Sequence, residues 1–78
     1  MKMEFEDALS LIKQGYDVRR RGWNGEGMYV SKTYSVSLGD IKLEQFAFIK
    51  TADDYFTPWT PSQKDMFATD WEVVREES

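Results

Sequence analysis

The chain has 78 residues, a net charge of −4 and neither cysteine nor histidine, while aromatic residues make up 15% of it. This composition excludes disulfides, thiol or imidazole catalysis and the usual zinc sites, and the acidic balance argues against nucleic acid or an anionic membrane as the main partner. A chain of this length forms one core, so we expect a single domain over residues 1–78. Such a small core gives marginal stability, which favours self-association.

The first part of the chain predicts a helix over Glu4–Gln14. Apolar side chains recur there with the period of a helix, acidic residues occupy the first turn, where the helix dipole favours them, and Gly15 follows as a typical stop. The recurring residues are Phe5, Ala8, Leu9 and Ile12. The same segment has no long apolar stretch, so it does not resemble a signal peptide, and no run in the chain approaches the about 20 residues that span a bilayer. Together with the absence of cysteine, this favours a cytoplasmic protein.

Four strands are predicted in the middle of the chain, from short β-prone runs bounded by turn residues. The first two flank the glycine-rich turn Gly22–Gly27, and the next two flank a turn at Asp53-Asp54. Between the pairs, Tyr34–Gln45 lacks a regular pattern, and we expect a short helical turn there. The predicted strands are Tyr16–Arg20, Met28–Thr33, Phe46–Thr51 and Tyr55–Trp59.

The C-terminal part predicts a second helix and a last strand, Trp71–Val74. Thr60 is the expected helix cap, with Pro61 at the first position and Gln63 completing a capping box, and the helix should end near Thr69. The order of helix, strands, helix and strand predicts an α+β fold. We expect a small antiparallel sheet of four to five strands with two helices packed on it, in a homo-oligomer.

The side chains favour binding over catalysis. No histidine is available to activate a hydroxyl, and the carboxylate pairs Asp53-Asp54 and Asp65…Asp70 are explained more simply by a turn and by a solvated helix. We therefore expect neither an enzyme nor a bound metal or cofactor.

Three features each leave two interpretations open. Arg20 shares its side of a strand with Val18, the core side, so it needs a ligand phosphate or a salt bridge to Asp65 or Asp70. Trp23, in a tight turn, either plugs the core or stacks on a ligand. The start of the second helix is either an anion site or an ordinary capped helix. Together these features suit a ligand with adenine and phosphate groups.

Several strings then carry a more specific signal. They are Phe5–Leu9, Arg20–Met28 with its Gly-Trp-Asn-Gly core, Lys50–Asp53, and Pro58-Trp59-Thr60-Pro61-Ser62-Gln63 continuing to Trp71. In this order and separation they resemble the Thoeris anti-defence family of small phage and prophage proteins. The likeness covers nearly the whole chain except Tyr34–Gln45. The family usually has Asp-Gly at positions 53 and 54, so Asp54 is expected in a left-handed conformation.

The resemblance implies a homotetrameric sponge in the cytoplasm of the infected cell. It would sequester cyclic ADP-ribose isomers made by bacterial TIR-domain enzymes without cleaving them, and some members also bind cyclic oligonucleotides at a separate site. Arg20 would pair with a phosphate, Trp23 would stack on adenine, Asn24 would hydrogen-bond base or ribose, Thr60 and Ser62 would contact phosphate or hydroxyl groups, and Asp65 would accept from a ribose hydroxyl. The rival hypothesis is an inhibitor that binds a host defence protein directly.

Overall fold

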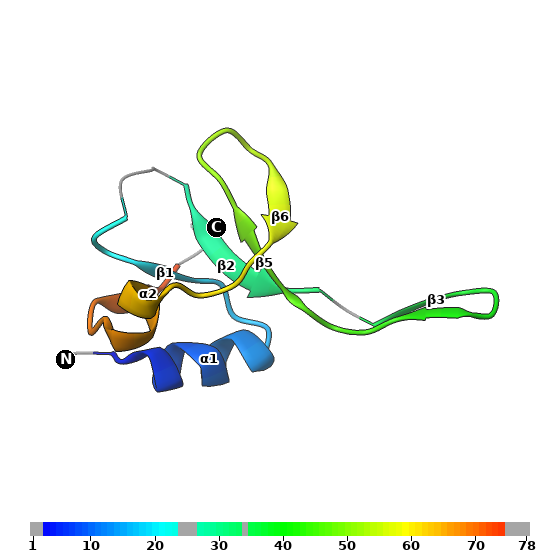
Figure 1. Ribbon diagram of the computed structural model, residues 1–78, viewed down its shortest axis with the longest axis horizontal. Coiled ribbons are helices and arrows are strands. Elements are labelled where there is room, and N and C mark those ends of the chain that lie inside the picture. Colours follow the sequence, from blue (N-terminus) through cyan, green and yellow to red (C-terminus); the bar gives the residue numbers. More distant parts are fainter. Residues whose placement is uncertain (1–2, 24–26, 34, 75–78) are drawn as a thin grey trace.

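The computed structural model describes residues 3–23, 27–33 and 35–74 of the chain. Two helices and seven strands lie within these ranges (Figure 1). In chain order they are α1 (Phe5–Lys13), β1 (Val18–Arg20), β2 (Tyr29–Lys32), β3 (Val36–Leu38), β4 (Ile41–Leu43), β5 (Ala47–Lys50), β6 (Phe56–Pro58), α2 (Gln63–Phe67) and β7 (Trp71–Val73). Neither helix in these ranges is long and apolar enough to cross a membrane.

Five of the strands form one sheet in the order β6-β5-β2-β1-β7, and every neighbouring pair is antiparallel. The α+β class and the antiparallel sheet are therefore confirmed. Tight turns explain much of this topology, because antiparallel neighbours need only short connections. Asp54, in the turn between β5 and β6, has a φ of 67° and so adopts the expected left-handed conformation.

The helix α1 starts and stops where the sequence predicts. The backbone N–H of Glu4 donates to Asp7 Oδ2 at 3.1 Å, and Gly15 follows the last turn with a φ of 99°, which an L-residue rarely adopts. The buried residues of α1 are Ala8 and Ile12, one turn apart on the face that meets the sheet.

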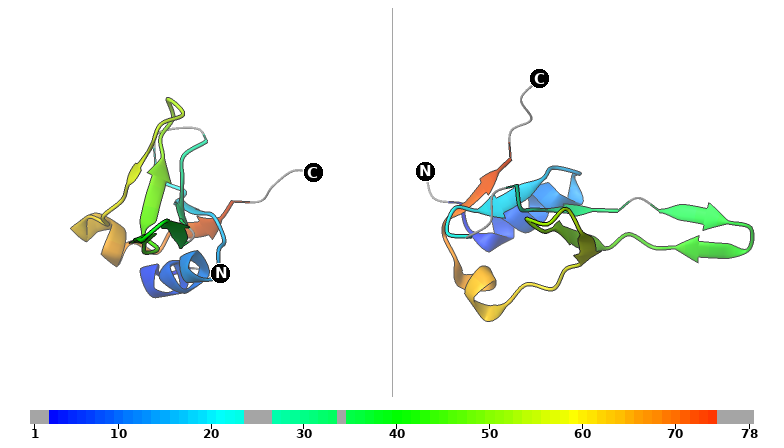
Figure 2. Two further views of the ribbon diagram at one scale, coloured as in Figure 1. Left: turned by 90° about the vertical axis from the view of Figure 1, so that its right-hand side faces the viewer. Right: turned by 90° about the horizontal axis from the view of Figure 1, so that it is seen from above.

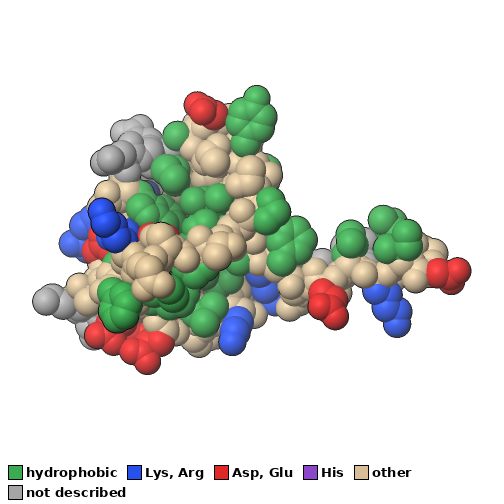
Figure 3. Space-filling model, in the orientation of Figure 1, with side chains coloured by type: hydrophobic (Ala, Val, Ile, Leu, Met, Phe, Trp, Pro, Cys, Tyr) green, Lys and Arg blue, Asp and Glu red, His purple; other side chains and the backbone are tan. Residues whose placement is uncertain are grey.

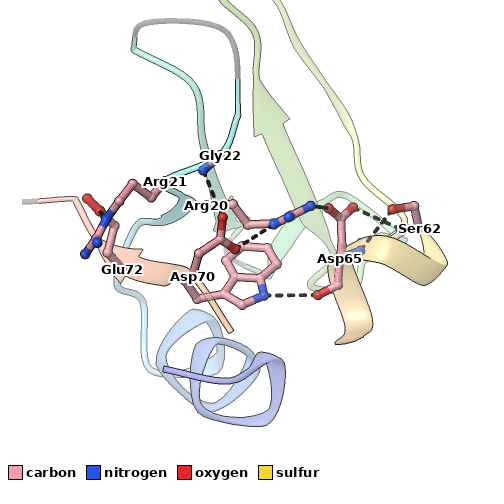
Figure 4. Close-up of polar contacts among 8 residues, drawn as sticks. Arg20, Arg21, Gly22, Ser62, Asp65, Asp70 and Glu72 are labelled. Atoms are coloured by element: carbon pink, nitrogen blue, oxygen red, sulfur yellow. Dashed lines mark hydrogen bonds and ion pairs between the residues drawn. The ribbon is translucent and has the colours of Figure 1, made fainter. Parts of the chain in front are cut away.

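The core lies between α1 and one face of the sheet. Val18 and Val30 oppose each other across β1 and β2, and both are fully buried. Trp71 on β7 is buried beside them and shares this face, because it pairs with Arg20, two residues from Val18. The helix α2 lies next to α1 and reaches the same face through Arg20 (Figures 1 and 4).

The helical turn expected within Tyr34–Gln45 is wrong. The segment contains the antiparallel strands β3 and β4, joined by Gly39-Asp40, with Gly39 at a φ of 62°. Leu38 and Ile41, whose spacing suggested a helix, instead oppose each other across this turn. Apolar and polar residues alternate on both sides of the turn, which is the period of a strand.

We call residues 36–43 the arm. Its pairing continues that of β2 and β5 in one register: Lys32 opposes Ala47, the backbone of Thr33 bonds to Phe46, and Leu38 opposes Ile41. The arm therefore is the outer half of a single hairpin whose inner half belongs to the sheet. It extends well away from the body (Figure 2), and the molecule measures 44 × 27 × 26 Å.

The start of the second helix also differs from the expectation. The N-cap is Ser62, not Thr60, and α2 ends at Phe67 rather than near Thr69. The Ser62 hydroxyl accepts from the Asp65 N–H at 3.1 Å, and the Asp65 carboxylate accepts from the Ser62 N–H at 3.0 Å. This capping box replaces the predicted one, because Asp65 is also held by Arg20 and so fixes the register of the first turn.

Candidate functional site

Arg20 is the centre of a network of ion pairs at the end of β1 (Figure 4). Its Nε donates to Asp70 Oδ1 at 2.9 Å, and its Nη1 donates to Asp65 Oδ1 at 3.0 Å. Asp70 lies directly before β7 and Asp65 lies in α2, so the network ties both elements to β1. The salt-bridge interpretation of Arg20 is confirmed for both partners. A phosphate contact through its remaining nitrogen stays a prediction.

The second carboxylate oxygen of Asp70, Oδ2, explains why a glycine, Gly22, follows shortly after β1. The backbone N–H of Gly22 donates to Asp70 Oδ2 at 2.9 Å. A Cβ at position 22 would lie only 2.9 Å from the same oxygen, closer than real Cβ atoms come. A side chain at position 22 would have to displace this carboxylate, so glycine favours the close approach, and the turn that carries Trp23 is thereby tied to the residue directly before β7.

An aromatic cluster adjoins the network and is centred on Trp71. Its ring centroid lies 5.8 Å from Phe5, 5.4 Å from Trp23 and 6.0 Å from Trp59, in tilted or edge-to-face arrangements that aromatic pairs prefer. The Trp71 indole also donates from Nε1 to the Asp65 backbone oxygen at 3.0 Å. The cluster and the ion pairs are therefore one connected structure.

Trp23 is partly buried against the core, and its ring meets the Trp71 ring at an interplanar angle of 78°. It thus has features of both earlier interpretations: one part packs as a plug, and another part stays accessible. The Trp23 indole also adds to the lowering of the pKa of Asp65. Stacking of a ligand on Trp23 remains a prediction.

The two carboxylates are held in their ionised form. Burial raises the pKa of Asp65, but hydrogen bonds from the Ser62 backbone and from Arg20 outweigh this, so its pKa is lowered. The pKa of Asp70 is lowered chiefly by its hydrogen bond from Arg20, and the Gly22 backbone adds to the effect. Groups that stay ionised at neutral pH are poor general acids. The arrangement suits structural support and binding better than proton transfer.

These pKa values predict a loss of stability in acid. A carboxyl whose folded-state pKa lies below its ordinary value of 3.8 stabilises the fold above that pH, and the contribution disappears as the pH falls through the folded-state pKa. The free energy of unfolding should therefore stay nearly constant from pH 7 to about 5 and decrease below about pH 4. Urea titrations between pH 7 and 3 would measure this.

Asp70→Asn is the matched variant for the acid experiment, because it removes one of the two carboxyl groups that Arg20 holds and keeps the shape of the side chain. Its free energy of unfolding should be lower at pH 7 and less dependent on pH between 4 and 3. Glu6, whose pKa is raised by Glu4, acts in the opposite direction but is exposed. Stability that increases from pH 5 to 3 would contradict the prediction.

The structure places four of the six candidate residues in this region. Arg20, Ser62 and Asp65 share one network, and Trp23 borders it. Thr60 is exposed and stands outside the network, two residues before the cap. Asn24 lies outside the described residues. The start of α2 is a capped helix, with the Ser62 and Asp65 N–H groups used in the cap. The anion-site interpretation of this helix start stays a prediction.

Sequence reasoning missed Trp71 and Trp59 as neighbours of the candidate site. Trp71 was recognised as part of a strand and of the strings that carry the family resemblance, and its central position follows from the pairing of β7 with β1. A signal was present, since three tryptophans in 78 residues are many. Their meeting point depends on tertiary structure.

Two neighbouring arginines lie on the opposite face of the sheet. Arg19 Nη2 and Arg21 Nε approach the Glu72 carboxylate at 3.1 and 3.3 Å, in exposed positions. The alternation of Arg19, Arg20 and Arg21 along the strand is as predicted. Exposed pairs of this kind contribute little to stability.

A separate hollow of about 690 Å³ is lined by the segment between α1 and β1 and by residues of β2, β5 and the end of β7. Its volume falls in the range of small-molecule pockets. Tyr16, Asp17, Ser31 and Lys32 are among its lining residues, and none of the six candidate residues is. It is thus distinct from the Arg20 network.

Comparison with known proteins places the chain among anti-defence proteins. Residues 3–74 match the family model described as Tad2-like, the Thoeris anti-defense 2-like domain. The chain is also similar to the protein named Thoeris anti-defense 2 from Bacillus phage SP01. The two are 38% identical over 85 aligned positions, which cover 94% of this chain and 96% of the phage protein.

Proposed function

This chain belongs to the Thoeris anti-defense 2-like family, an anti-defence family, and we propose that it is a non-catalytic sponge for a cyclic ADP-ribose-type nucleotide signal. The observation that carries the proposal is the family match, which extends over nearly the whole chain. By holding the signal, the protein prevents its effector from receiving it. The sponge works in the cytoplasm of the infected cell as a homotetramer, and cyclic oligonucleotides are further candidate ligands.

The Arg20 network and the aromatic cluster support a binding role. A nucleotide offers a flat base and several phosphates. The Trp23 side chain acts on the Asp65 carboxylate, which is also paired with Arg20, so an aromatic ring and a partly buried cation meet at one carboxylate. Arg20 donates through Nε and Nη1 to carboxylates, so a phosphate would use Nη2. Its ion pairs fix the direction of the guanidinium before the ligand arrives, which reduces the ordering cost of binding.

The remaining candidate residues take peripheral roles in this proposal. Thr60 is exposed and offers its hydroxyl to a phosphate or ribose. The Ser62 hydroxyl accepts from the Asp65 N–H and keeps its own proton for a ligand oxygen. Asp65 positions Arg20, and its carboxylate also accepts a hydrogen bond from a ribose hydroxyl. Asn24 contacts the base or ribose.

Isothermal calorimetry against a panel of cyclic ADP-ribose isomers and cyclic dinucleotides tests the proposal. We expect at least one cyclic ADP-ribose isomer to bind, and heat denaturation of the complex should release it chemically intact, as seen by mass spectrometry. Protein denatured before mixing is the control.

Two results would change the assignment. Linear ADP-ribose in amounts that grow with incubation time would make the protein an enzyme that degrades the signal. Absence of affinity for every nucleotide in the panel would favour the rival function, direct inhibition of a host defence protein.

A further inference from the structure

The arm presents an aliphatic face that its own chain leaves uncovered. Leu38 and Ile41 are 62% and 63% exposed, and Leu43 is 49% exposed. Residues opposite or two apart in a hairpin share a side, so these three lie on one face, while Ser37 and Lys42 lie on the other. Figure 3 shows hydrophobic side chains along one side of the arm and charged side chains along the other.

This face continues the core side of the sheet. Because the pairing keeps one register from β2 and β5 into the arm, Leu38 and Ile41 have the same orientation along the strands as Val30 and Ile49. In the body, that side is covered by α1 and α2. Neither helix of the described chain reaches the arm (Figures 1 and 2). The apolar face therefore continues from the sheet into the arm, where neither α1 nor α2 covers it.

An isolated two-stranded hairpin is at best marginally stable in water and gains stability when an apolar face packs on something. A contiguous exposed apolar face therefore marks an interaction site. Its aliphatic character resembles the interfaces of homo-oligomers, which are more apolar than those of transient complexes.

The same chain offers a matching surface. An apolar hollow of about 360 Å³ lies at the base of the arm, on the sheet face that no described helix covers. Its walls are almost entirely apolar, and Phe46 and Phe56 are exposed there. The residues that line it are Thr33, Phe46, Phe48, Phe56, Thr57 and Pro58.

We propose that the arm is the element that joins two copies of this chain, with the aliphatic face of each arm seated in the apolar hollow of the other copy. A two-fold axis makes such an exchange reciprocal, so one kind of contact closes the pair without leaving a free arm. This inference rests on the proposed self-association and names the surface responsible for it.

The test compares two faces of the same arm by light scattering over a range of concentrations. The double variant Leu38→Ser/Ile41→Ser should raise the concentration for half-assembly about 30-fold or more, as loss of central interface residues does. Lys42→Ser, on the opposite face, should assemble like the wild type. Phe56→Ser should weaken assembly as the double variant does, and unchanged assembly of this variant would overturn the hollow as the seat.

A wild-type protein that is monomeric at every concentration would overturn both self-association and the role of the arm. An assembled wild type with an equally assembled double variant would overturn the role of the arm alone, and calorimetry with the signal stays independent of either result.

Should the double variant fail to fold, cysteine labelling supplies the second readout, because the chain has no cysteine of its own. Ile41→Cys should react with a maleimide more slowly than Ser37→Cys in the assembled protein, and equal rates would overturn the proposal.

Discussion

Arg20→Met should lower the free energy of unfolding by about 2–4 kcal/mol, whereas Arg19→Met should change it by less than about 1 kcal/mol. The two arginines are neighbours on β1 and differ in their surroundings. The Arg20 side chain is 20% exposed, and its partners Asp65 and Asp70 are 11% and 32% exposed. Removing this cation leaves two carboxylates close together without compensation, which is costly in a partly buried site.

Arg19 provides the matched control, because its pair with Glu72 is exposed and Glu72 keeps Arg21 as a second partner. Urea unfolding of both variants at pH 7 measures the difference. The loss in Arg20→Met should shrink at pH 4, where protonation relieves the carboxylates. Equal effects of the two substitutions would show that the Arg20 network does not stabilise the fold.

Trp23→Ala should weaken binding of the signal about 5- to 150-fold, the range for loss of one base stacked on an aromatic ring, and leave the protein folded. Trp71→Ala should instead cost about 3–5 kcal/mol of stability, as truncation of a buried aromatic does. Trp71 is buried at the centre of the cluster, while Trp23 packs at its edge. Because the free energy of unfolding of a small domain is of similar size to this loss, the Trp71→Ala protein should be largely unfolded.

Melting temperature and calorimetric affinity, measured for both variants, separate support of the core from contact with the ligand. If Trp23→Ala melts and binds like the wild type, Trp23 is neither a plug nor a stacking surface, and the proposed site is in the wrong place. A Trp23→Ala protein that unfolds like Trp71→Ala would assign the ring to the core alone.

The sequence was informative where local chemistry determined the structure. The period of Phe5, Ala8 and Ile12 together with Gly15 defined α1 within a residue at each end. The position of Arg20 on the core side of a strand correctly required an anionic partner. In both cases the cause lies in residues that are close along the chain or in the simple alternation of a strand.

The errors arose where two local signals competed. Thr60 before Pro61 is a good helix start by itself, but tertiary contact of Asp65 with Arg20 selected the start at Ser62. The spacing of Leu38 and Ile41 is compatible with a helix and also with a tight hairpin. The strand register that continues from β2 and β5 favours the hairpin.

The aromatic cluster was beyond sequence reasoning for a different reason. Its members come from α1, the turn after β1, the segment after β6, and β7, and only the folded sheet brings them together. A composition rich in tryptophan predicts that rings will be buried in the core or exposed to a ligand, but it does not predict which rings contact one another.

All three tryptophans of the chain belong to this one cluster, so intrinsic fluorescence reports on a single spot in the molecule. Emission should respond to a ligand that stacks on Trp23 and to global unfolding. The arm and the apolar hollow at its base contain no tryptophan, so dissociation of copies through the arm leaves the indoles in place. Unlabelled wild-type protein therefore carries an optical probe that distinguishes occupancy of the candidate site from the state of assembly.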